Sequence, residues 1–414
     1  MIIKVRPAPV RPEDVFTPRS SHVNSAMYIS RRRLEGALQQ ALRGNPHIVV
    51  HGESGTGKSW LYQKTFADNG VIYTVANLAN AKRLGSISAE LKNLADREGE
   101  LVKTTVIEKK SADVNALVAK GSVENSSSFA VGQLEPFEAL LKLLNKRASD
   151  QPSILVLDNL EAAFEDSLLT ELANLIILCD DARYSRYKVK LLIVGVPREV
   201  KYYYYKTPHH QTVANRLTEL PEVSRLTTEQ TASLVETGFI KLLSYIVTDI
   251  EKLKKHVHWI TTGVPQMVHE SCLQLAYIGE GSRSISDADI SAADEKWTND
   301  SMYHAISAIE QHMNERDTRA GRRNQTIFAL SVCEGDQMKT AEIESVVRSE
   351  FPVSTGSVVI NVAQMLSQLA SGNVPLIKRT PRGDAFEFSD PRYRMALRAV
   401  LRKVDERVER IQLR

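Results

Sequence analysis

The sequence predicts an α/β fold in which a doubly wound parallel sheet is followed by a helical subdomain and a small C-terminal module. In the first half, short apolar runs that suit buried strands alternate with helical patterns, which is typical of a parallel sheet covered on both faces. From Thr227 onward the strand patterns fade and helices dominate. The length of 414 residues agrees, because domains usually contain about 100–200 residues and this chain should form two or three compact units.

The composition excludes several classes of protein. Hydrophobic residues make up 43% and charged residues 25% of the chain, as in globular proteins and unlike disordered or fibrous ones. No apolar run approaches the roughly 18 residues of a membrane helix, and the first ten residues lack the apolar core of a secretion signal. We therefore expect a cytoplasmic protein with no membrane partner. Cys179, Cys272 and Cys333 lie far apart in apolar surroundings, which favours reduced thiols over a disulfide frame or a zinc site.

The formal net charge is only +3, but basic residues gather at both ends of the chain. Residues 1–43 contain eight Lys or Arg against three acidic residues, and the last 44 residues contain eleven against six. Each end thus has an excess of about five positive charges. This pattern is typical either of a surface that meets an anionic partner or of a solvated basic surface.

The elements of the first half follow from apolar spacing. Residues 1–24 contain several prolines and basic residues and are expected to form an extended basic arm. Leu34, Leu38 and Leu42 then recur every fourth residue and predict a helix over 28–43. The core, 25–226, continues with a strand at 47–51, a glycine-rich turn with a helix at 58–67, a strand at 71–75, a helix at 84–97, a polar insertion at 102–133, a helix at 134–148, a strand at 154–157, a helix at 167–181 and a strand at 190–194.

The second half is predicted to hold a helical lid subdomain and a smaller module. The lid, 227–313, comprises helices at 228–243, 249–260, 264–277 and 287–313, and a charged linker at 314–324 follows it. The C-terminal domain, 325–414, comprises helical patterns at 325–333, 340–351 and 354–370, two alternating segments at 375–379 and 385–388 joined by a turn, and a terminal helix.

The glycine-rich turn carries the strongest functional signal. It fits the pattern G-x-x-x-x-G-K-[ST] between a predicted strand and a predicted helix, the context that a phosphate-binding loop requires. Glycines let backbone N–H groups turn toward an anion, Lys58 neutralises the β- and γ-phosphates, and the Ser59 hydroxyl ligates Mg²⁺. We assign binding of ATP to Gly52, Glu53, Ser54, Gly55, Thr56, Gly57, Lys58 and Ser59, together with Trp60, the next helical residue.

A metal-bound triphosphate also needs a carboxylate at the end of a neighbouring strand. Asp158 follows the apolar run 154–157 and is our candidate for this Walker B position, where it would hold Mg²⁺ together with Ser59. The alternative is an Asp that only caps the following helix.

Hydrolysis further requires a group that orients the attacking water. Asn159 follows Asp158 directly and is favoured by position, whereas Glu161, three residues after Asp158, is favoured by chemistry. We prefer Glu161, with a solvated Glu at a helix start as the alternative. Slow hydrolysis, suited to a switch more than to a motor, is the expected consequence.

Further segments resemble the AAA+ ATPases, and within them the origin-recognition-like and STAND-like groups. Tyr28-Ile29-Ser30-Arg31 is similar to the nucleotide-base pocket segment ahead of their core, which assigns Tyr28 and Ile29 to cofactor binding. The run 191–197 looks like their sensor strand, although it ends in Val196-Pro197 without the usual polar residue.

The resemblance also implies residues that respond to nucleotide. The segment 210–217, with Leu220-Pro221, is similar to the one before the last sheet strand, and there Arg216 could act as an arginine finger on a neighbouring subunit; an ordinary ion pair is the alternative. Gly263-Val264-Pro265-Gln266 is similar to the lid turn, so Pro265 joins the cofactor pocket. Gln266 stands where many relatives have a sensing arginine, which again implies slow or oligomer-dependent turnover.

The C-terminal module resembles the winged helix that closes many of these ATPases, so the resemblance covers about residues 25–410. Lys378, Arg379 and Arg382 would lie at the wing tip and could grip DNA phosphates. However, the segment 354–370, in the position of a DNA-reading helix, contains no Lys or Arg. DNA contact and protein contact or autoinhibition both stay open.

The resemblance implies a cytoplasmic ATPase that binds ATP and Mg²⁺ and forms a homo-oligomer in the ATP state. Two functions follow from it. One is a switch that acts on DNA or on DNA-bound machinery. The other is a STAND-like signalling protein, for example in antiviral defence, whose winged helix binds protein and controls a separate effector.

Overall fold

The computed structural model describes residues 10–97, 135–196, 210–313, 321–356, 358–380 and 382–410. The polar insertion predicted at 102–133 and most of the predicted linker lie outside this range. The chain divides into two compact units. One contains residues 21–23 and 30–224, and the other contains residues up to Ser20, Asn24–Ile29 and everything from Arg225 onward.

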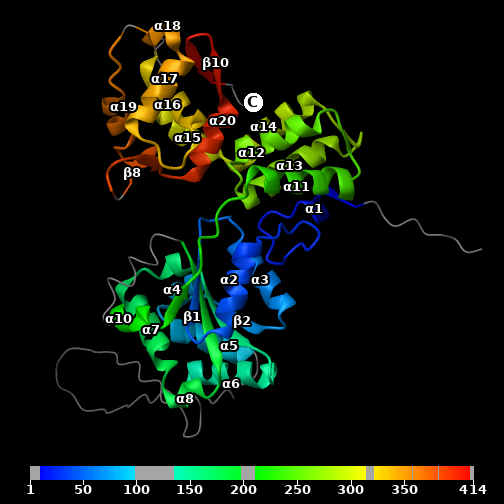
Figure 1. The fold of residues 1–414 in the computed structure, drawn as a ribbon, viewed down its shortest axis with the longest axis vertical. Coiled ribbons are helices and arrows are strands. Elements are labelled where there is room, and N and C mark those ends of the chain that lie inside the picture. The colour runs from blue at the N-terminus through cyan, green and yellow to red at the C-terminus, as the bar shows by residue number, and fades with distance from the viewer. Residues whose placement is uncertain are drawn as a thin grey trace, which may run out of the picture. The chain divides into compact units, whose positions relative to one another are not determined.

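A five-stranded parallel sheet is the centre of the first unit (Figure 1). The strand order is β2 (Ile72–Asn77), β3 (Ser153–Asp158), β4 (Val189–Gly195), β1 (His47–His51) and β5 (Leu217–Glu219). All four strand pairs are parallel. Since the carboxyl ends of parallel strands share one edge, the loops after β1 and β3 lie on the same side of the sheet.

Helices cover both faces of this sheet because successive side chains of each strand point to opposite faces. On one face, Ile48 and Val50 pack with residues of α2 (Arg32–Arg43) and α3 (Lys58–Asp68). On the other face, Val49 packs in the cluster to which four more helices contribute. These are α4 (Leu78–Leu84), α5 (Ile87–Arg97), α6 (Pro136–Ala148) and α7 (Asp166–Leu178). The predicted α/β doubly wound fold is confirmed.

Short elements complete this unit. The 3₁₀ helix η1 (Leu160–Ala163) follows β3, while α8 (Ala182–Ser185) precedes β4 and α10 (His210–Ala214) precedes β5. Lys190 of β4 donates to the backbone oxygens of Ala41 and Leu42 at 3.0 and 2.6 Å, so it caps the end of α2.

The second unit begins with a group of helices built around an apolar cluster. These are α11 (Thr228–Glu236), the π-helical turn η2 (Thr237–Leu242), α12 (Ile250–Thr261), α13 (Pro265–Gly279) and α14 (Asp287–Ser301), with short strands β6 (Ile246–Val247) and β7 (Ser284–Ile285). The helix expected over 287–313 is interrupted at Met302, after which α15 (Tyr303–His312) begins.

The N-terminal segment differs from the extended arm that the prolines predicted. It contains the short helix α1 (Pro12–Val15), and Val15, Phe16 and Met27 are buried in the cluster formed by these helices. The ring centroids of Phe16 and Phe239 lie 4.9 Å apart. The reason for the difference is hydrophobic burial, which outweighs the extended preference of the flanking prolines.

The C-terminal part of this unit contains α16 (Arg322–Val332), α17 (Thr340–Glu350), α18 (Pro352–Thr355) and α19 (Val362–Leu369), then an antiparallel pair, β8 (Ile377–Arg379) and β9 (Phe386–Phe388). This element order agrees with the one that suggested a winged helix. The terminal helix α20 (Pro391–Val400) is shorter than expected, because the chain turns at Asp405 into the hairpin β10 (Leu401–Val404) and β11 (Arg407–Arg410).

Candidate nucleotide-binding site

The predicted phosphate-binding loop connects β1 to α3 with the backbone shape that its glycines permit. Gly55 and Gly57 have φ values of 78° and 87°, a region that residues with side chains rarely adopt. A Cβ added to Gly52 would lie 2.5 Å from the Val223 backbone oxygen. The loop therefore depends on glycine at three positions, for backbone conformation at two and for close packing at one.

Lys58 lies in the first turn of α3 and reaches back over this loop. Its Nζ atom donates to the backbone oxygens of Gly52 at 2.8 Å and Glu53 at 2.9 Å. Burial lowers the pKa of the Lys58 ammonium, and the negative charges of Glu161 and Asp158 act in the opposite direction. The Lys58 ammonium therefore lies where a bound phosphate could replace its hydrogen bonds to two neutral carbonyl oxygens with a stronger, charge-assisted one.

Arg31 is a residue of this site that sequence reasoning did not single out. Its guanidinium donates to the Thr56 backbone oxygen at 2.7 Å and to the Ser224 backbone oxygen at 2.9 Å. Glu35 accepts from the Arg31 backbone N–H at 2.7 Å. Arg31 therefore ties the phosphate-binding loop to the residue at the end of the first unit. Its place in the segment that resembled a nucleotide-base pocket was the only signal.

Asp158 ends β3 at the same edge of the sheet, where the register places it opposite Asn77 of β2. Burial raises the pKa of the Asp158 carboxyl and the charge of Glu161 raises it further, whereas the backbone N–H of Asn159 and the charge of Lys58 lower it. A half-buried carboxylate whose charged form is favoured by nearby positive charge suits a magnesium ligand.

Asn159 and Glu161 occupy different settings. Asn159 has a left-handed backbone with φ of 62°, and its side-chain amide donates to Asn77 Oδ1 at 3.1 Å. A carboxamide is not a base near neutral pH, so the Asn159 side chain cannot accept the proton of the attacking water. Glu161 is exposed in η1, and its charge acts on both Lys58 and Asp158.

Tyr62, also missed from sequence, is buried in α3 three residues after Ser59. Burial and the charge of Asp158 raise the pKa of its hydroxyl, and a side-chain hydrogen bond to Ser59 lowers it. The Ser59 side chain thus hydrogen-bonds to the phenolic hydroxyl of Tyr62, and the charge of Asp158 acts on the same group. A hydroxyl and a carboxylate are oxygen donors of the kind that Mg²⁺ prefers, so the residues fit this ion. Trp60 is half-buried one residue further along α3.

The predicted arginine finger lies away from this edge. Arg216 precedes β5, and its backbone oxygen accepts from the N–H of His47, the first residue of β1. Its guanidinium forms an ion pair with Asp180 at 2.6 Å. Arg216 is therefore at the amino edge of the sheet, opposite to Lys58, so a role in hydrolysis would require another subunit.

The remaining predicted pocket residues belong to the second unit. Ile29 packs against its apolar cluster, and Pro265 is the first residue of α13. Tyr28 is in the same unit. Their contribution to the nucleotide pocket stays a prediction.

A family model and several solved structures resemble this chain. Residues 30–185 match the family model described as AAA ATPase domain. No curated protein matches the chain. The chain is similar to solved structures at low identity: the Walker-type ATPase of Pyrococcus abyssi (12% identity, TM-score 0.48, 90% of this chain and 96% of that one) and the ORC2 protein of Aeropyrum pernix in its ADP form (12%, 0.48, 93% and 96%). A STAND protein with a tetratricopeptide repeat sensor from Pyrococcus horikoshii is also similar (15%, 0.33, 90% and 42%).

Proposed function

We propose that this chain, whose residues 30–185 are an AAA+ P-loop ATPase domain, is a slow ATP-dependent switch. The observation that carries the proposal is the position of Lys58. Its ammonium is held over the glycine loop by two backbone oxygens, at the sheet edge where Asp158 also lies. This is the arrangement that a metal-bound triphosphate requires.

The residues divide the work as follows. The backbone of residues 52–57 and Lys58 would bind the phosphates, and Ser59 and Asp158 would hold Mg²⁺. The ion, when bound, neutralises charge on the phosphate oxygens. Arg31 would keep the loop in shape through Thr56, and Tyr62 would orient the Ser59 hydroxyl.

Glu161 would take the proton of the attacking water. Support comes from its charge, which acts on both Lys58 and Asp158, and from the side-chain amide of Asn159, which is already bonded to Asn77. Because Glu161 is exposed and follows Asp158 by three residues, we expect slow turnover until the site is completed by another subunit. Arg216 is our candidate for that completing group, since it lies at the opposite edge of its own sheet.

Binding of ATP by the purified protein tests this proposal. Calorimetry with a nonhydrolysable ATP analogue and Mg²⁺ should detect binding to the natural protein and none, or at least a hundredfold weaker binding, to Lys58→Ala. Lys64→Ala is a matched control, because Lys64 lies on the same helix and pairs with Asp68 at 2.5 Å. Equal affinity of the natural protein and Lys58→Ala would contradict the site.

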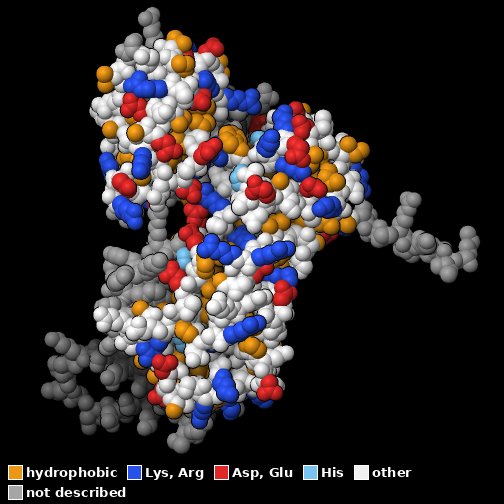
Figure 2. Space-filling view, in the orientation of Figure 1, with side chains coloured by type: hydrophobic (Ala, Val, Ile, Leu, Met, Phe, Trp, Pro, Cys, Tyr) orange, Lys and Arg blue, Asp and Glu red, His pale blue; other side chains and the backbone are white. Residues whose placement is uncertain are grey.

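DNA is the first candidate for what the switch acts on. Lys378, Arg379 and Arg382 are exposed on and beside the hairpin β8–β9, and Figure 2 shows Lys and Arg side chains where this hairpin lies. Lys378 pairs with Glu387 at 3.6 Å, and Arg379 lies over the Phe386 ring at 4.7 Å. These contacts hold both cations near the turn of the hairpin, where phosphates could replace Glu387 as the partner of Lys378.

A protein partner is the second candidate, and specific observations favour it. The exposed face of α19 is uncharged, with Ala363, Gln364, Ser367 and Gln368. Before it, Val353 and Val359 are 84% and 93% exposed. An uncharged helix beside exposed valines suits protein contact better than phosphate contact. In this case the chain would be a STAND-like signalling ATPase that controls a separate effector, for example in antiviral defence.

A further inference from the structure

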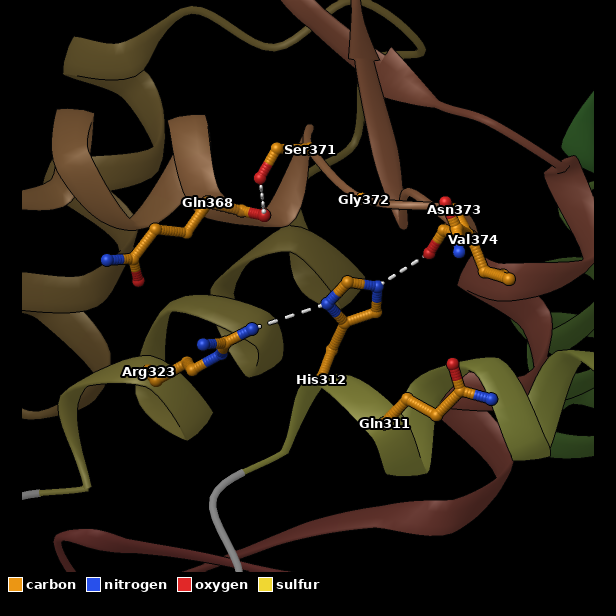
Figure 3. Close-up of a pocket in the computed structure, with 8 residues that line it drawn as sticks. All are labelled: Gln311, His312, Arg323, Gln368, Ser371, Gly372, Asn373 and Val374. Carbon is orange, nitrogen blue, oxygen red and sulfur yellow. Dashed lines mark hydrogen bonds between the residues drawn. The ribbon is translucent and has the colours of Figure 1, made fainter.

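A polar cavity in the C-terminal part of the chain has no role in the nucleotide site. Its volume is about 440 Å³. It lies among the end of α15, the start of α16, the end of α19 and the connection to β8 (Figure 3). The lining residues are Gln311, His312, Arg323, Gln368, Ser371, Gly372, Asn373 and Val374.

His312 and Arg323 form the floor of this cavity. His312 is 8% exposed, and its Nε2 atom lies 2.7 Å from the Val374 backbone oxygen. Because a carbonyl oxygen only accepts, Nε2 must carry the proton and Nδ1 must present its lone pair. That lone pair faces the Arg323 guanidinium, which donates to it at 3.3 Å. Figure 3 shows the guanidinium pointing at the ring.

Among the residues that the structure describes, this neutral contact is not accompanied by a counter-ion for Arg323. None of the eight lining residues is acidic, and no ion pair of Arg323 occurs among the described residues. The buried Nε atom of Arg323 also has no hydrogen-bond partner among the described residues. Glu310, the acidic residue next to Gln311, pairs with Arg410. Within the described residues, the guanidinium thus has a neutral partner and can still form stronger bonds, because hydrogen bonds to oxyanions are about twice as strong as neutral ones.

The other lining groups extend this chemistry. The carboxamides of Gln311, Gln368 and Asn373 can each donate and accept hydrogen bonds. Gly372 has φ of 93°, and nothing lies within 4 Å of the Cβ that it lacks, so the backbone turns here without closing the opening. A volume of about 440 Å³ falls within the range of small-molecule sites, roughly 300–1,000 Å³.

We propose that this cavity binds a small phosphate monoester of about nucleotide size. The planar guanidinium of Arg323 would take the phosphate oxygens in a forked contact, and the carboxamides would recognise the polar remainder of the ligand. This site is separate from the phosphate-binding loop, and the proposal does not rest on ATP hydrolysis.

Direct binding to the full chain tests the proposal, in a Lys58→Ala background that removes the other phosphate site. Calorimetry with AMP, and with inorganic phosphate as the minimal probe, should detect binding at the cavity. Arg323→Gln should weaken both ligands by at least about tenfold, as expected for loss of a charged hydrogen-bonding partner. Arg323→Lys should restore only part of the affinity, since a lysine keeps the charge and loses the fork.

Arg402→Gln is the matched control, because it removes the same charge from an exposed position on β10. It should bind both ligands as the background does. If Arg323→Gln is unfolded by circular dichroism, Gln368→Ala replaces it, and weaker AMP binding is expected. The proposal is overturned if the Arg323 variant binds like the background, if the Arg402 control loses as much affinity, or if a short DNA duplex displaces phosphate better than AMP does.

Discussion

At the scale of single residues, we expect Arg31 to position the phosphate-binding loop through hydrogen bonds to backbone oxygens. Its guanidinium donates to the backbone oxygen of Thr56 in the phosphate-binding loop and to that of Ser224. Arg31→Ala should weaken ATP binding by about tenfold, because loss of a charged donor leaves the loop carbonyl without its partner. Calorimetry measures this effect. Arg32→Ala is the control, since Arg32 is the next residue along the chain and its side chain is exposed. An equal loss of ATP affinity in both variants would contradict the positioning role of Arg31.

Glu161 offers a second prediction at this scale. Glu161→Gln should leave ATP affinity within about twofold and lower steady-state hydrolysis by at least about a hundredfold, because the amide cannot accept the proton of water. Phosphate release assayed with saturating ATP measures the loss. Glu165→Gln changes a nearby carboxylate that pairs with Lys82 and should have no effect. Unchanged turnover in Glu161→Gln would reassign the base.

His47 gives a pH dependence with a definite sign. Burial lowers the pKa of the His47 imidazole to about 4. The negative charge of Asp180 raises this pKa, and the positive charges of Lys190 and Arg216 lower it further. The unfolded chain therefore binds the proton first, and stability that is present near pH 7 is lost as the pH falls from about 6.5 toward 4. The loss at pH 5 should be on the order of 2 kcal/mol. Urea unfolding at both pH values measures it, and His47→Gln should flatten the pH dependence.

At the scale of elements, the π-helical turn η2 shows how a glycine admits a distant segment. A Cβ on Gly238 would lie 2.3 Å from Cζ of Phe16 and 3.2 Å from Cε of Met27. Gly238→Ala should lower the free energy of unfolding by about 1–3 kcal/mol, because the added methyl must displace a buried ring. Thermal unfolding measures this. Gly281→Ala is the control, since nothing lies within 4 Å of that position.

Variants in the hairpin β8–β9 distinguish between the two candidate partners, DNA and protein. If DNA is the partner, replacing Lys378, Arg379 and Arg382 together by Gln should weaken binding and reduce the salt slope by about three. A mobility assay at several salt concentrations measures both. Salt-independent or absent DNA binding, together with ATP-dependent assembly, would favour a protein partner at α19 instead.

At the scale of the whole molecule, the proposed role of Arg216 as an arginine finger would make assembly a requirement for turnover. Arg216 is held by Asp180 at the amino edge of the sheet, so in the proposed role it would act on the site of another copy. Hydrolysis per chain should rise with protein concentration, and Arg216→Ala should abolish that rise while ATP binding persists. Light scattering with ATP gives the assembly state, and a concentration-independent rate would contradict action between subunits.

Across the molecule, the described helices include none that is long and apolar enough to cross a membrane. The second unit holds its two parts together through Arg398 of α20, whose guanidinium lies 5.0 Å from the centre of the Trp259 ring and donates to the Ser331 backbone oxygen at 2.7 Å. Burial lowers the pKa of Arg398 to about 10, with the charges of Arg394 and Arg225 adding to the effect. The helical group and the C-terminal part are therefore packed as one unit.

The sequence by itself determined four of the five strands, the glycine loop and the residues that follow β1 and β3, since these rest on local patterns: apolar runs, glycines and a lysine at a fixed spacing. Tertiary structure alone decided the contacts of Arg31 and Tyr62, the burial of Phe16 against Gly238, and the hairpin that follows α20 after Val400. Each of those depends on contacts between residues far apart in the chain, or on packing that overrides local preference. The spacing of residues along one segment carries no record of such contacts.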